Sequence, residues 1–436
     1  MARITRRRFL QYSGAGMAGI LAAHRAPVFA QANTVHILRW NDFVPAADKV
    51  LREVYAPEVQ KALGIKLNVE TINANDLPAR STAAIQSGSG PDIILMLNNY
   101  PHLYASAGVD VGALADEVGK AQEGIYPAAA RLNRVGGKWV SMPWSLVPSI
   151  VAYRKSWFDE VGAKTFPKTW QEYAAVGKKL KANKHPIGQT LGNTFGDAPT
   201  FTYPLLWSFG GQEVDASGKK VALNSKETLE SVKFMLQFWK DAHDEGGLAW
   251  DDSNNNRSFL SGDISATLNG ASIYVAALNG ADKFKTEKGA PLHTDIQHAP
   301  LPAGPKGQHG YHTAHNHMVM KYSKNQKGAI EFLRWAHKKE NLEKWIVVQK
   351  GYAVGTTKVW EKHPMWNEYP VMAPFKVAAS QQSRLMGYSG EPDQKAAEAW
   401  NKFIVTVMYA QACSGKMTPE ESVKWAAGEL AKIYSA

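Results

Sequence analysis

Residues 34–97, TVHILRWNDFVPAADKVLREVYAPEVQKALGIKLNVETINANDLPARSTAAIQSGSGPDIILML, alternate short apolar runs with helical stretches. The apolar runs predict strands at 34–40, 65–72 and 92–97, and the residues between them predict helices at 46–63 and 75–87. Pro57 should kink or divide the first helix. The order strand–helix–strand–helix–strand indicates an α/β fold that begins as a doubly wound parallel sheet.

The rest of the chain continues this mixture of helices and strands. Thr169 and Thr418 each precede a Glu by three residues, which is typical of helix N-termini. An apolar stripe between 225 and 245 predicts a helix that faces the core. The uncharged stretch 264–281 contains Asn and Gly residues that favour a strand, a loop and a helix start over a membrane span. Strand patterns return at 294–299 and 311–320.

Length and composition restrict the class of protein. A chain of 436 residues exceeds one hydrophobic core, so we expect two or three packing units. The single cysteine, Cys413, excludes an internal disulfide and any zinc or iron–sulfur site held by cysteines of this chain alone. The formal net charge is +11, but the first thirty residues hold five Arg and no acid, which leaves 45 basic against 39 acidic residues. The remaining net charge of +6 is scattered, so we expect no nucleic-acid partner.

The N-terminus has the features of an export signal. Arginines at 6–8 precede a short Gly/Ala-rich apolar stretch, and small residues at Ala30 and Ala32 offer cleavage sites. The paired arginines resemble a twin-arginine signal, except that Gln11 stands where Lys is commoner. We expect residues 1–32 to be removed on export to the periplasm. No cysteine near the cleavage region could carry a lipid anchor, so we expect a soluble product.

Motifs of catalysis are absent. No phosphate-binding loop, zinc-protease or serine-hydrolase pattern occurs. The densest titratable cluster is His309, His312, His315 and His317, whose imidazoles could bind a metal. No acid stands near to orient them, and a strand would turn His312 away from His315 and His317, so we predict no metal site. We also predict no cofactor and no enzymatic activity, and leave open whether this cluster contacts a ligand.

Two short segments suit a binding site. They are Trp40, Asn41 and Asp42 after the first predicted strand, and Asn98, Asn99 and Tyr100 after the third. Ligands of open α/β sheets lie beyond the carboxyl ends of the strands. An aromatic ring beside amides and carboxylates suits a sugar, because the C–H face stacks on the ring while the hydroxyls meet the polar groups. The alternative is that Trp40 and Tyr100 merely edge the core.

Further segments, taken in order, resemble one family. They are SGSGPDII at 87–94, GKWVSMPWSLVPSIVAYRKSWF at 137–158, FPKTWQEY at 166–173, FLSGDISATLNGASIY at 259–274, and PLPAGPKG and GAIEFL between 300 and 333. The chain resembles the family 1 extracellular solute-binding proteins, which are receptors of ABC importers and relatives of maltose-binding protein. The resemblance implies a periplasmic binding protein type II-like fold, in which two doubly wound α/β lobes joined by hinge crossings hold the ligand between them. One lobe would comprise 33–147 and 311–357, and the other 148–310 and 358–436.

The resemblance also implies ligand contacts. Trp144 and Ser145 match the first crossing between the lobes, and Tyr311 and His312 match the return crossing. Aromatic contacts of the second lobe match Tyr203 and Trp207. The remaining matches are Gly270, Ser272, Arg384 and Tyr388. Maltose-binding protein has Trp where this chain has Ser272, which argues against its way of stacking malto-oligosaccharides.

The implied function is capture without chemistry. A carbohydrate, from monosaccharide or polyol to short oligosaccharide, would close the lobes, and the closed monomer would dock on ABC permease subunits in the inner membrane. The net charge of +6 and Arg384 keep open an anionic sugar derivative, such as a sugar acid or a glycerol phosphate compound. The competing classes are a twin-arginine-exported enzyme and a structural or adhesion protein. The sequence names neither the solute nor its affinity.

Overall fold

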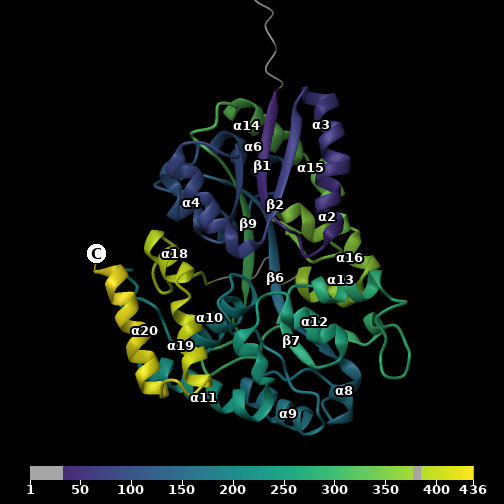
Figure 1. The fold of residues 1–436 in the computed structure, drawn as a ribbon, viewed down its shortest axis with the longest axis vertical. Helices are drawn as coiled ribbons and strands as arrows, with labels where there is room; N and C mark the ends of the chain where they lie inside the picture. Colours follow the sequence, from purple (N-terminus) through teal and green to yellow (C-terminus); the bar gives the residue numbers. More distant parts are fainter. Residues whose placement is uncertain (1–32, 377–383, 436) are drawn as a thin grey trace, which may run out of the picture.

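The computed structural model of the chain describes residues 33–376 and 384–435. The expected export signal at 1–32 lies outside these residues. The described chain forms two α/β lobes stacked along the long axis of the molecule, and strands run from one lobe into the other (Figure 1).

A mixed sheet of eight strands passes through both lobes. Its first-lobe strands are β1 (Thr34–Trp40), β2 (Lys66–Ile72), β3 (Ile93–Leu97), β6 (Met142–Arg154), β9 (Tyr311–Val319) and β10 (Val354–Gly355). The strand order is β10-β6-β9-β3-β1-β2. β1 pairs in parallel with β2 and β3, which confirms the predicted strand–helix–strand–helix–strand unit, whereas β9 runs antiparallel to β3. Every residue of β3 is buried, as its unbroken apolar sequence predicts.

The predicted helix at 46–63 is divided. α2 (Pro45–Lys49) passes into a π-helical stretch, Val50–Tyr55, and α3 (Ala56–Leu63) follows. Pro57 lies in the first turn of α3. Because proline has no N–H to donate, the regular hydrogen-bond ladder cannot pass through it, and the wider π turn accommodates the break.

Further helices surround the first-lobe strands. They are α4 (Leu77–Ser87), α5 (Tyr100–Leu103), α6 (Gly112–Ala121), α7 (Pro127–Asn133), α14 (Gln326–Ala336) and α15 (Lys339–Val348), with a small two-stranded sheet of β4 (Arg134–Val135) and β5 (Lys138–Trp139). α14 packs against α3, β1 and β9, and α15 packs against α2. Residues 311–357 thus complete the lobe that residues 33–147 begin.

The second lobe is built on the far half of β6. β7 (Ala266–Asn269) and β8 (Ile296–Ala299) both pair antiparallel with this half. Its helices are α8 (Lys155–Glu160), α9 (Trp170–Ala182), α10 (Asp197–Phe209), α11 (Lys226–Ala242), α12 (Asn254–Ser261), α13 (Ser272–Asn279), α18 (Gln394–Asn401), α19 (Ile404–Cys413) and α20 (Pro419–Tyr434). Capping boxes at Thr169 and Thr418 begin α9 and α20, as predicted. The predicted stripe of α11 is buried at Val232, Met235 and Trp239.

β6 and β9 carry the chain between the lobes. Residues 142–149 of β6 pair with β9, and residues 150–154 pair with β7 and β8. This change of partners supports the lobe boundaries at 147/148 and 310/311 that we propose. The short 3-10 helix Lys358–Lys362 stays with the first lobe, because Glu361 accepts from Tyr126 and Lys362 pairs with Glu123. We therefore propose the third crossing after this helix, before α16 (Met365–Glu368).

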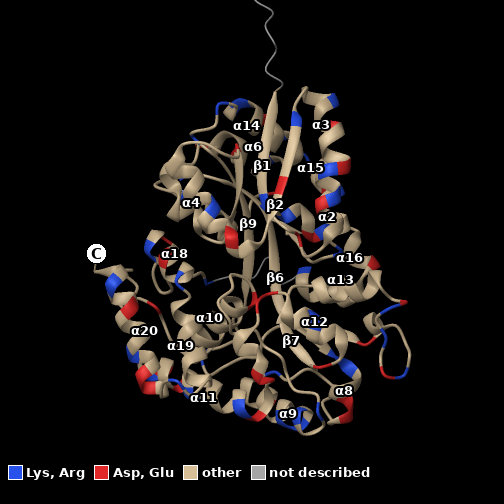
Figure 2. Cartoon of the chain, in the orientation of Figure 1, with Lys and Arg blue, Asp and Glu red and all other residues tan. Residues whose placement is uncertain are grey.

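Charges of both signs are interspersed on the outer helices. α3 and α20 each carry Lys beside Glu (Figure 2). Within residues 33–376 and 384–435, no helix has the length and apolar character needed to cross a membrane.

Candidate functional site

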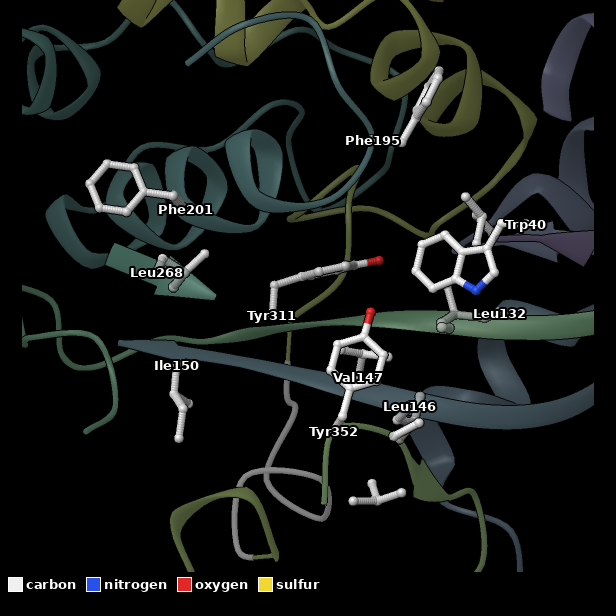
Figure 3. Packing of buried hydrophobic residues seen from close by; sticks show 14 of the residues in the cluster. Trp40, Leu132, Leu146, Val147, Ile150, Phe195, Phe201, Leu268, Tyr311 and Tyr352 are labelled. Carbon is white, nitrogen blue, oxygen red and sulfur yellow. The ribbon is translucent and has the colours of Figure 1, made fainter. Parts of the chain in front are cut away.

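A small cavity of about 20 Å³ lies between the two lobes, where β1 ends and β6 and β9 cross. We call it the inner cavity. Its lining residues are Trp40, Phe43, Val147, Ser149, Gly196, Asp197, Asp252, Asn269, Gly270, Ser272, Thr313 and Tyr352. Figure 3 shows Trp40 and Tyr352 with Val147 of the crossing strand β6. The first lobe supplies the aromatic rings, the crossing strands supply hydroxyls, and the second lobe supplies carboxylates and amides.

Trp40, Phe43 and Tyr352 form one side of the inner cavity, the aromatic wall. Trp40 ends β1, and its ring meets Phe43 edge-on with 5.5 Å between the centroids. The Phe43 and Tyr352 centroids lie 6.4 Å apart. His315 packs against Trp40 edge-on at 4.5 Å and fixes its ring. These rings offer a flat apolar surface on which the C–H face of a sugar can stack.

Two polar atoms of the aromatic wall make no hydrogen bond to any described residue. They are the indole Nε1 of Trp40, which is a buried atom, and the hydroxyl of Tyr352, which is not. Both side chains are nearly buried, with exposed fractions of 3% and 4%. A buried polar group without a partner costs about 1–3 kcal/mol. The inner cavity therefore presents two groups that a bound ligand can satisfy.

Asp197, Asp252, Asn269 and Ser272 form the opposite side, the polar wall. Asp252 lies at the N-terminus of α10: its Oδ1 accepts the Asp197 N–H at 2.7 Å and its Oδ2 accepts the Gly196 N–H at 3.0 Å. A helix N-terminus favours such a carboxylate. Ser272 Oγ donates to Asn269 Oδ1 at 2.9 Å.

Glycine allows the two walls to approach each other. A Cβ at Gly270 would lie 2.8 Å from both the Tyr352 ring and the Val147 side chain. A Cβ at Gly196 would lie 2.7 Å from Asp252 Oδ2. Both distances are shorter than side chains tolerate. A larger residue at position 270 would therefore move the two walls apart, and one at position 196 would displace Asp252 within the polar wall.

The pKa values of the carboxyl groups in the polar wall lie above their ordinary values. Burial, and then the charge of Asp252, raise the pKa of Asp197 well above its ordinary value. Burial also raises the pKa of Asp252, against the hydrogen bonds that it accepts. The pKa of Tyr352 is raised well above its ordinary value by burial, and then by the charges of Asp42 and Asp197. The polar wall therefore favours ligands that donate hydrogen bonds or carry positive charge.

A second cavity of about 220 Å³, the outer cavity, shares Phe43 and Asp252 with the inner one. Its other lining residues are Asn41, Asp42, Asn73, Ala74, Asn75, Thr194, Asp251 and Ser253. Asp42 accepts the Val44 N–H at 2.9 Å and an N–H of Gln349 at 3.2 Å. Burial raises the pKa of Asp42 to about 6. The cleft thus continues from an aromatic chamber into a polar one.

Five of the residues inferred from the sequence line these cavities. Trp40, Gly270 and Ser272 line the inner cavity, and Asn41 and Asp42 line the outer cavity. The structure brings together the segment after β1 and the segment after β7, which lie more than two hundred residues apart in the sequence. The other inferred residues line neither cavity.

Asn98, Asn99 and Tyr100 are buried beyond the end of β3. Asn98 Oδ1 accepts a main-chain N–H of β9 at 3.1 Å. The Tyr100 hydroxyl donates to Asn401 Oδ1 at 3.2 Å, and Asn99 Nδ2 reaches the main-chain carbonyl of Pro392 at 3.4 Å. These side chains hold the crossing strand and join the two lobes.

Trp144, Ser145 and His312 are buried within the crossing strands. The Arg39 guanidinium lies over the Trp144 ring, 5.4 Å from its centroid. Ser145 Oγ lies 2.9 Å from His315 Nδ1. Trp144 and Ser145 thus belong to the packing of the first lobe.

Tyr203, Trp207, Tyr311 and Trp400 form a buried aromatic group that we call the core cluster. Tyr203 lies 5.8 Å from Trp207 and 4.7 Å from Trp400, and Tyr311 lies 5.0 Å from Trp400, measured between ring centroids. Arg384 stacks over the Tyr388 ring at 4.3 Å and donates to the Trp207 main-chain carbonyl at 3.1 Å. Tyr203 and Trp207 of α10 are buried against Trp400 of α18 and Tyr311 of β9 and line neither cavity, so we leave all of these residues out of the proposed site.

Sequence reasoning missed most of the inner cavity. Asp197 and Asp252 are 55 positions apart and meet only through the loop that places Asp252 on the start of α10. One local signal existed: Gly196 and Asp197 precede Pro199, a pattern typical of a helix N-terminus. Tyr352 follows α15, and nothing in its neighbourhood distinguishes it from a core residue.

In the part of the chain that the structure describes, no three His, Cys, Asp or Glu side chains are grouped as metal ligands would be. His317 Nε2 lies 3.0 Å from Arg39 Nη1. Burial, and then the charge of Arg39, lower the pKa of both His315 and His317 well below the ordinary value. These two imidazoles are therefore neutral and serve the packing of the first lobe.

Known proteins share this architecture. MalE3 of T. maritima with bound maltose superposes with a TM-score of 0.77 at 19% identity, over 92% of this chain and 99% of that one. A sugar transporter protein of Arthrobacter chlorophenolicus with bound laminaribiose gives a TM-score of 0.77 at 15% identity, over 92% and 99% of the chains. A solute-binding protein of Agrobacterium radiobacter in complex with ribitol gives 0.73 at 19% identity, over 92% and 98%. These likenesses confirm the predicted fold.

Sequence comparison identifies the family. A probable ABC transporter-binding protein of Deinococcus radiodurans is 24% identical over 321 residues, which are 71% of this chain and 72% of that protein. The diacetylchitobiose binding protein DasA of Streptomyces coelicolor is 27% identical over 168 residues, 36% of each chain. The family model of the bacterial extracellular solute-binding proteins matches residues 28–343. The chain belongs to the bacterial extracellular solute-binding protein family.

Proposed function

We propose that the protein is the substrate-binding component of an ABC importer and captures a small carbohydrate in the inner cavity. The observation that carries this proposal is the arrangement of that cavity, in which an aromatic wall faces a polar wall across the two lobes. Stacking on Trp40 and hydrogen bonds to Asp197 and Asn269 would satisfy both faces of a sugar.

The small size of the inner cavity favours a monosaccharide or polyol over a longer ligand. Its volume of about 20 Å³ is far below the roughly 300–1,000 Å³ of small-molecule sites, so even a small solute would enter only when the lobes move apart. A longer ligand would extend into the outer cavity. The structural relatives support a carbohydrate, since they were solved with maltose, laminaribiose and ribitol.

An anionic sugar derivative fits this site poorly. Neither cavity has a Lys, Arg or His among its described lining residues, whereas Asp42, Asp197 and Asp252 contribute carboxyl groups. Arg384, which suggested an anion from the sequence, lies over Tyr388 beside the core cluster. We therefore propose an uncharged or positively charged solute.

We further propose that binding closes the two lobes about β6 and β9. The lobes also touch outside the cavities, through Asn99, Tyr100 and the ion pair of Arg131 with Glu391, whose atoms lie 2.9 Å apart. Opening would break these contacts, together with the hydrogen bond from Thr194 Oγ1 to Asn75 Oδ1 at 3.4 Å, and expose both walls. Export through the twin-arginine pathway, a periplasmic location and docking of the closed form on permease subunits complete the proposal.

The proposal is tested by a screen of sugars, polyols and sugar acids. A ligand present at a hundred times its Kd should stabilise the fold by about 2.7 kcal/mol and raise the melting temperature. Solution scattering should then give a smaller radius of gyration with ligand than without it. The ligand should be recovered chemically unchanged after long incubation. Turnover of the ligand would instead support the exported enzyme, and identical scattering curves at saturation would overturn closure.

A further inference from the structure

One carboxylate oxygen in the inner cavity has no hydrogen-bond partner among the described residues. Asp197 is 93% buried, since its exposed fraction is 7%. Its Oδ2 accepts from Asn255 Nδ2 at 2.6 Å and from Asn269 Nδ2 at 3.4 Å. Its Oδ1 accepts no hydrogen bond from the residues that the structure describes, while the side chain lines the cavity. This oxygen is not sealed inside the core, so a hydrogen-bond donor of a ligand in the cavity can reach it.

The surroundings add negative charge and supply no positive charge. Asp252 is adjacent to Asp197, whose own N–H it accepts at 2.7 Å. Asp251 and Asp252 line the outer cavity, together with Asp42. No basic side chain occurs among the described lining residues of either cavity. The negative charge of these aspartates is thus not balanced by any basic side chain among the described lining residues.

Asp252 and Asp197 differ in what satisfies them. Asp252 accepts from two main-chain N–H groups and from the Thr194 hydroxyl at 2.6 Å, so its charge is well supported. Asp197 has only amide donors on one oxygen. Burial, and then the charge of Asp252, raise the pKa of Asp197 well above its ordinary value, so the empty cavity disfavours the ionised pair. A cation beside Asp197 would remove that penalty, whereas a neutral hydroxyl would only supply a hydrogen bond.

The aromatic wall also suits a cation. Trp40, Phe43 and Tyr352 are tilted against one another, with interplanar angles of 78° and 54° between successive rings. The negative faces of such rings attract ammonium groups within about 6 Å of their centroids. The Trp40 Nε1, buried and without a partner among the described residues, is a second, independent sign of a missing polar ligand, and the Tyr352 hydroxyl also has no partner there.

We propose that the solute carries a protonated amine, which binds Asp197 Oδ1 beside Asp252 while its ring stacks on Trp40. An amino sugar is the ligand class that meets both walls. This inference rests on the proposed function and narrows its substrate. It assigns Asp197 the recognition of charge and leaves the recognition of the sugar ring to the aromatic wall.

The experiment compares matched pairs of probes by calorimetry at pH 7. The pairs are glucosamine with glucose, galactosamine with galactose, and mannosamine with mannose, and N-acetylglucosamine serves as a control that keeps the nitrogen but loses the charge. At least one amino sugar should bind about tenfold or more tightly than its neutral partner, because a hydrogen bond between charged groups is much stronger than a neutral one. N-acetylglucosamine should bind no better than glucose.

Asp197→Asn keeps the shape and the acceptor that Asn255 requires, but removes the charge. In this variant the amino sugar and its neutral partner should bind with about the same affinity. Asp282→Asn, which removes the same charge from an exposed position of the second lobe, is the matched control and should keep the preference. The comparison on the unaltered protein needs no variant, so a folding defect in Asp197→Asn would not obscure the result.

Three outcomes would overturn the inference. One is equal affinity for amino and neutral sugars in every pair, which would leave a neutral carbohydrate as the ligand and the proposed function intact. Another is a preference that survives in Asp197→Asn. The third is no binding of any amino sugar up to about 10 mM, weaker than any specific receptor requires. If the wider screen of neutral solutes also gave no thermal shift, the proposed function would fail separately.

Discussion

The sequence predicts that Trp40 and Trp207 both contact the ligand, but the two side chains lie in different surroundings. Trp40 lines a cavity between the lobes, and its Nε1 has no partner among the described residues. Trp207 lies in the core cluster with no exposed surface, and its Nε1 donates to Glu213 Oε2 at 3.4 Å. The same side chain thus faces a vacant volume in one region and a filled one in the other. This difference separates residues that bind from residues that support.

The largest effect is expected from Trp207→Ala. Removing this ring from a filled core should lower the free energy of unfolding by about 3–5 kcal/mol, because the cavity left behind adds to the lost transfer energy. Urea denaturation followed by fluorescence measures it. Ligand affinity of the folded fraction should change little, and a large loss of affinity with unchanged stability would place Trp207 among the binding residues.

The fold could be predicted from the sequence because its signals are local. The unit at 34–97, the capping boxes and the strand patterns each depend on neighbouring residues, and the structure confirms them. The inner cavity depends instead on distant pairs. Gly270 meets Tyr352 at a distance that no local pattern encodes, and Asp252 reaches the start of α10 through a loop. Trp40 was accessible to sequence reasoning because the end of a parallel strand is itself a place where ligands bind.

The core cluster should also respond to pH through Glu213. Burial raises the pKa of Glu213 to about 8, although Gly387 N–H donates to it at 2.7 Å. The folded protein therefore keeps this carboxyl protonated at pH values at which the unfolded chain has released the proton. The stabilisation from this proton is complete below the ordinary pKa of Glu and declines as the pH rises toward about 8. The slope from this group is at most about 1.4 kcal/mol per pH unit. Denaturation at pH values between the ordinary pKa of Glu and about 8 measures the free energy of unfolding. This free energy should decline less steeply with pH in Glu213→Gln than in the unaltered protein.

A parallel decline in both proteins would assign the pH dependence to other buried groups. Asp197 is one of them, since its pKa is also raised well above the ordinary value. Adding a saturating ligand distinguishes the two regions. A ligand amine that pairs with Asp197 should reduce the part of the decline that belongs to the inner cavity and leave the part that belongs to Glu213.

Trp40→Ala should weaken ligand binding by about 1.5–4 kcal/mol, which is roughly ten- to a thousandfold in Kd. The loss combines the apolar area of the indole with its stacking on the sugar. Calorimetry with the solute found in the screen measures it. Trp425→Ala on α20, where the side chain is half-buried and remote from both cavities, is the matched control for the loss of a tryptophan. Unchanged affinity in Trp40→Ala, with melting preserved, would falsify the aromatic wall.

The smallest effect is expected when one hydroxyl oxygen is removed from the inner cavity or from the core cluster. Because so little else changes, this pair of variants separates the two regions most sharply. The hydroxyls of Tyr352 and Tyr203 both lack a partner among the described residues, and both side chains are nearly buried. Tyr203 lies in the core cluster, where no ligand can satisfy it, so Tyr203→Phe should leave affinity unchanged and stability equal or slightly higher. Tyr352 lines the inner cavity, so Tyr352→Phe should weaken binding by about 0.5–1.5 kcal/mol with little change in stability. Paired calorimetry and thermal melts on the two variants measure both quantities. Equal affinities would mean that the ligand does not reach the Tyr352 hydroxyl, and the binding volume would then lie nearer to Trp40 and the outer cavity.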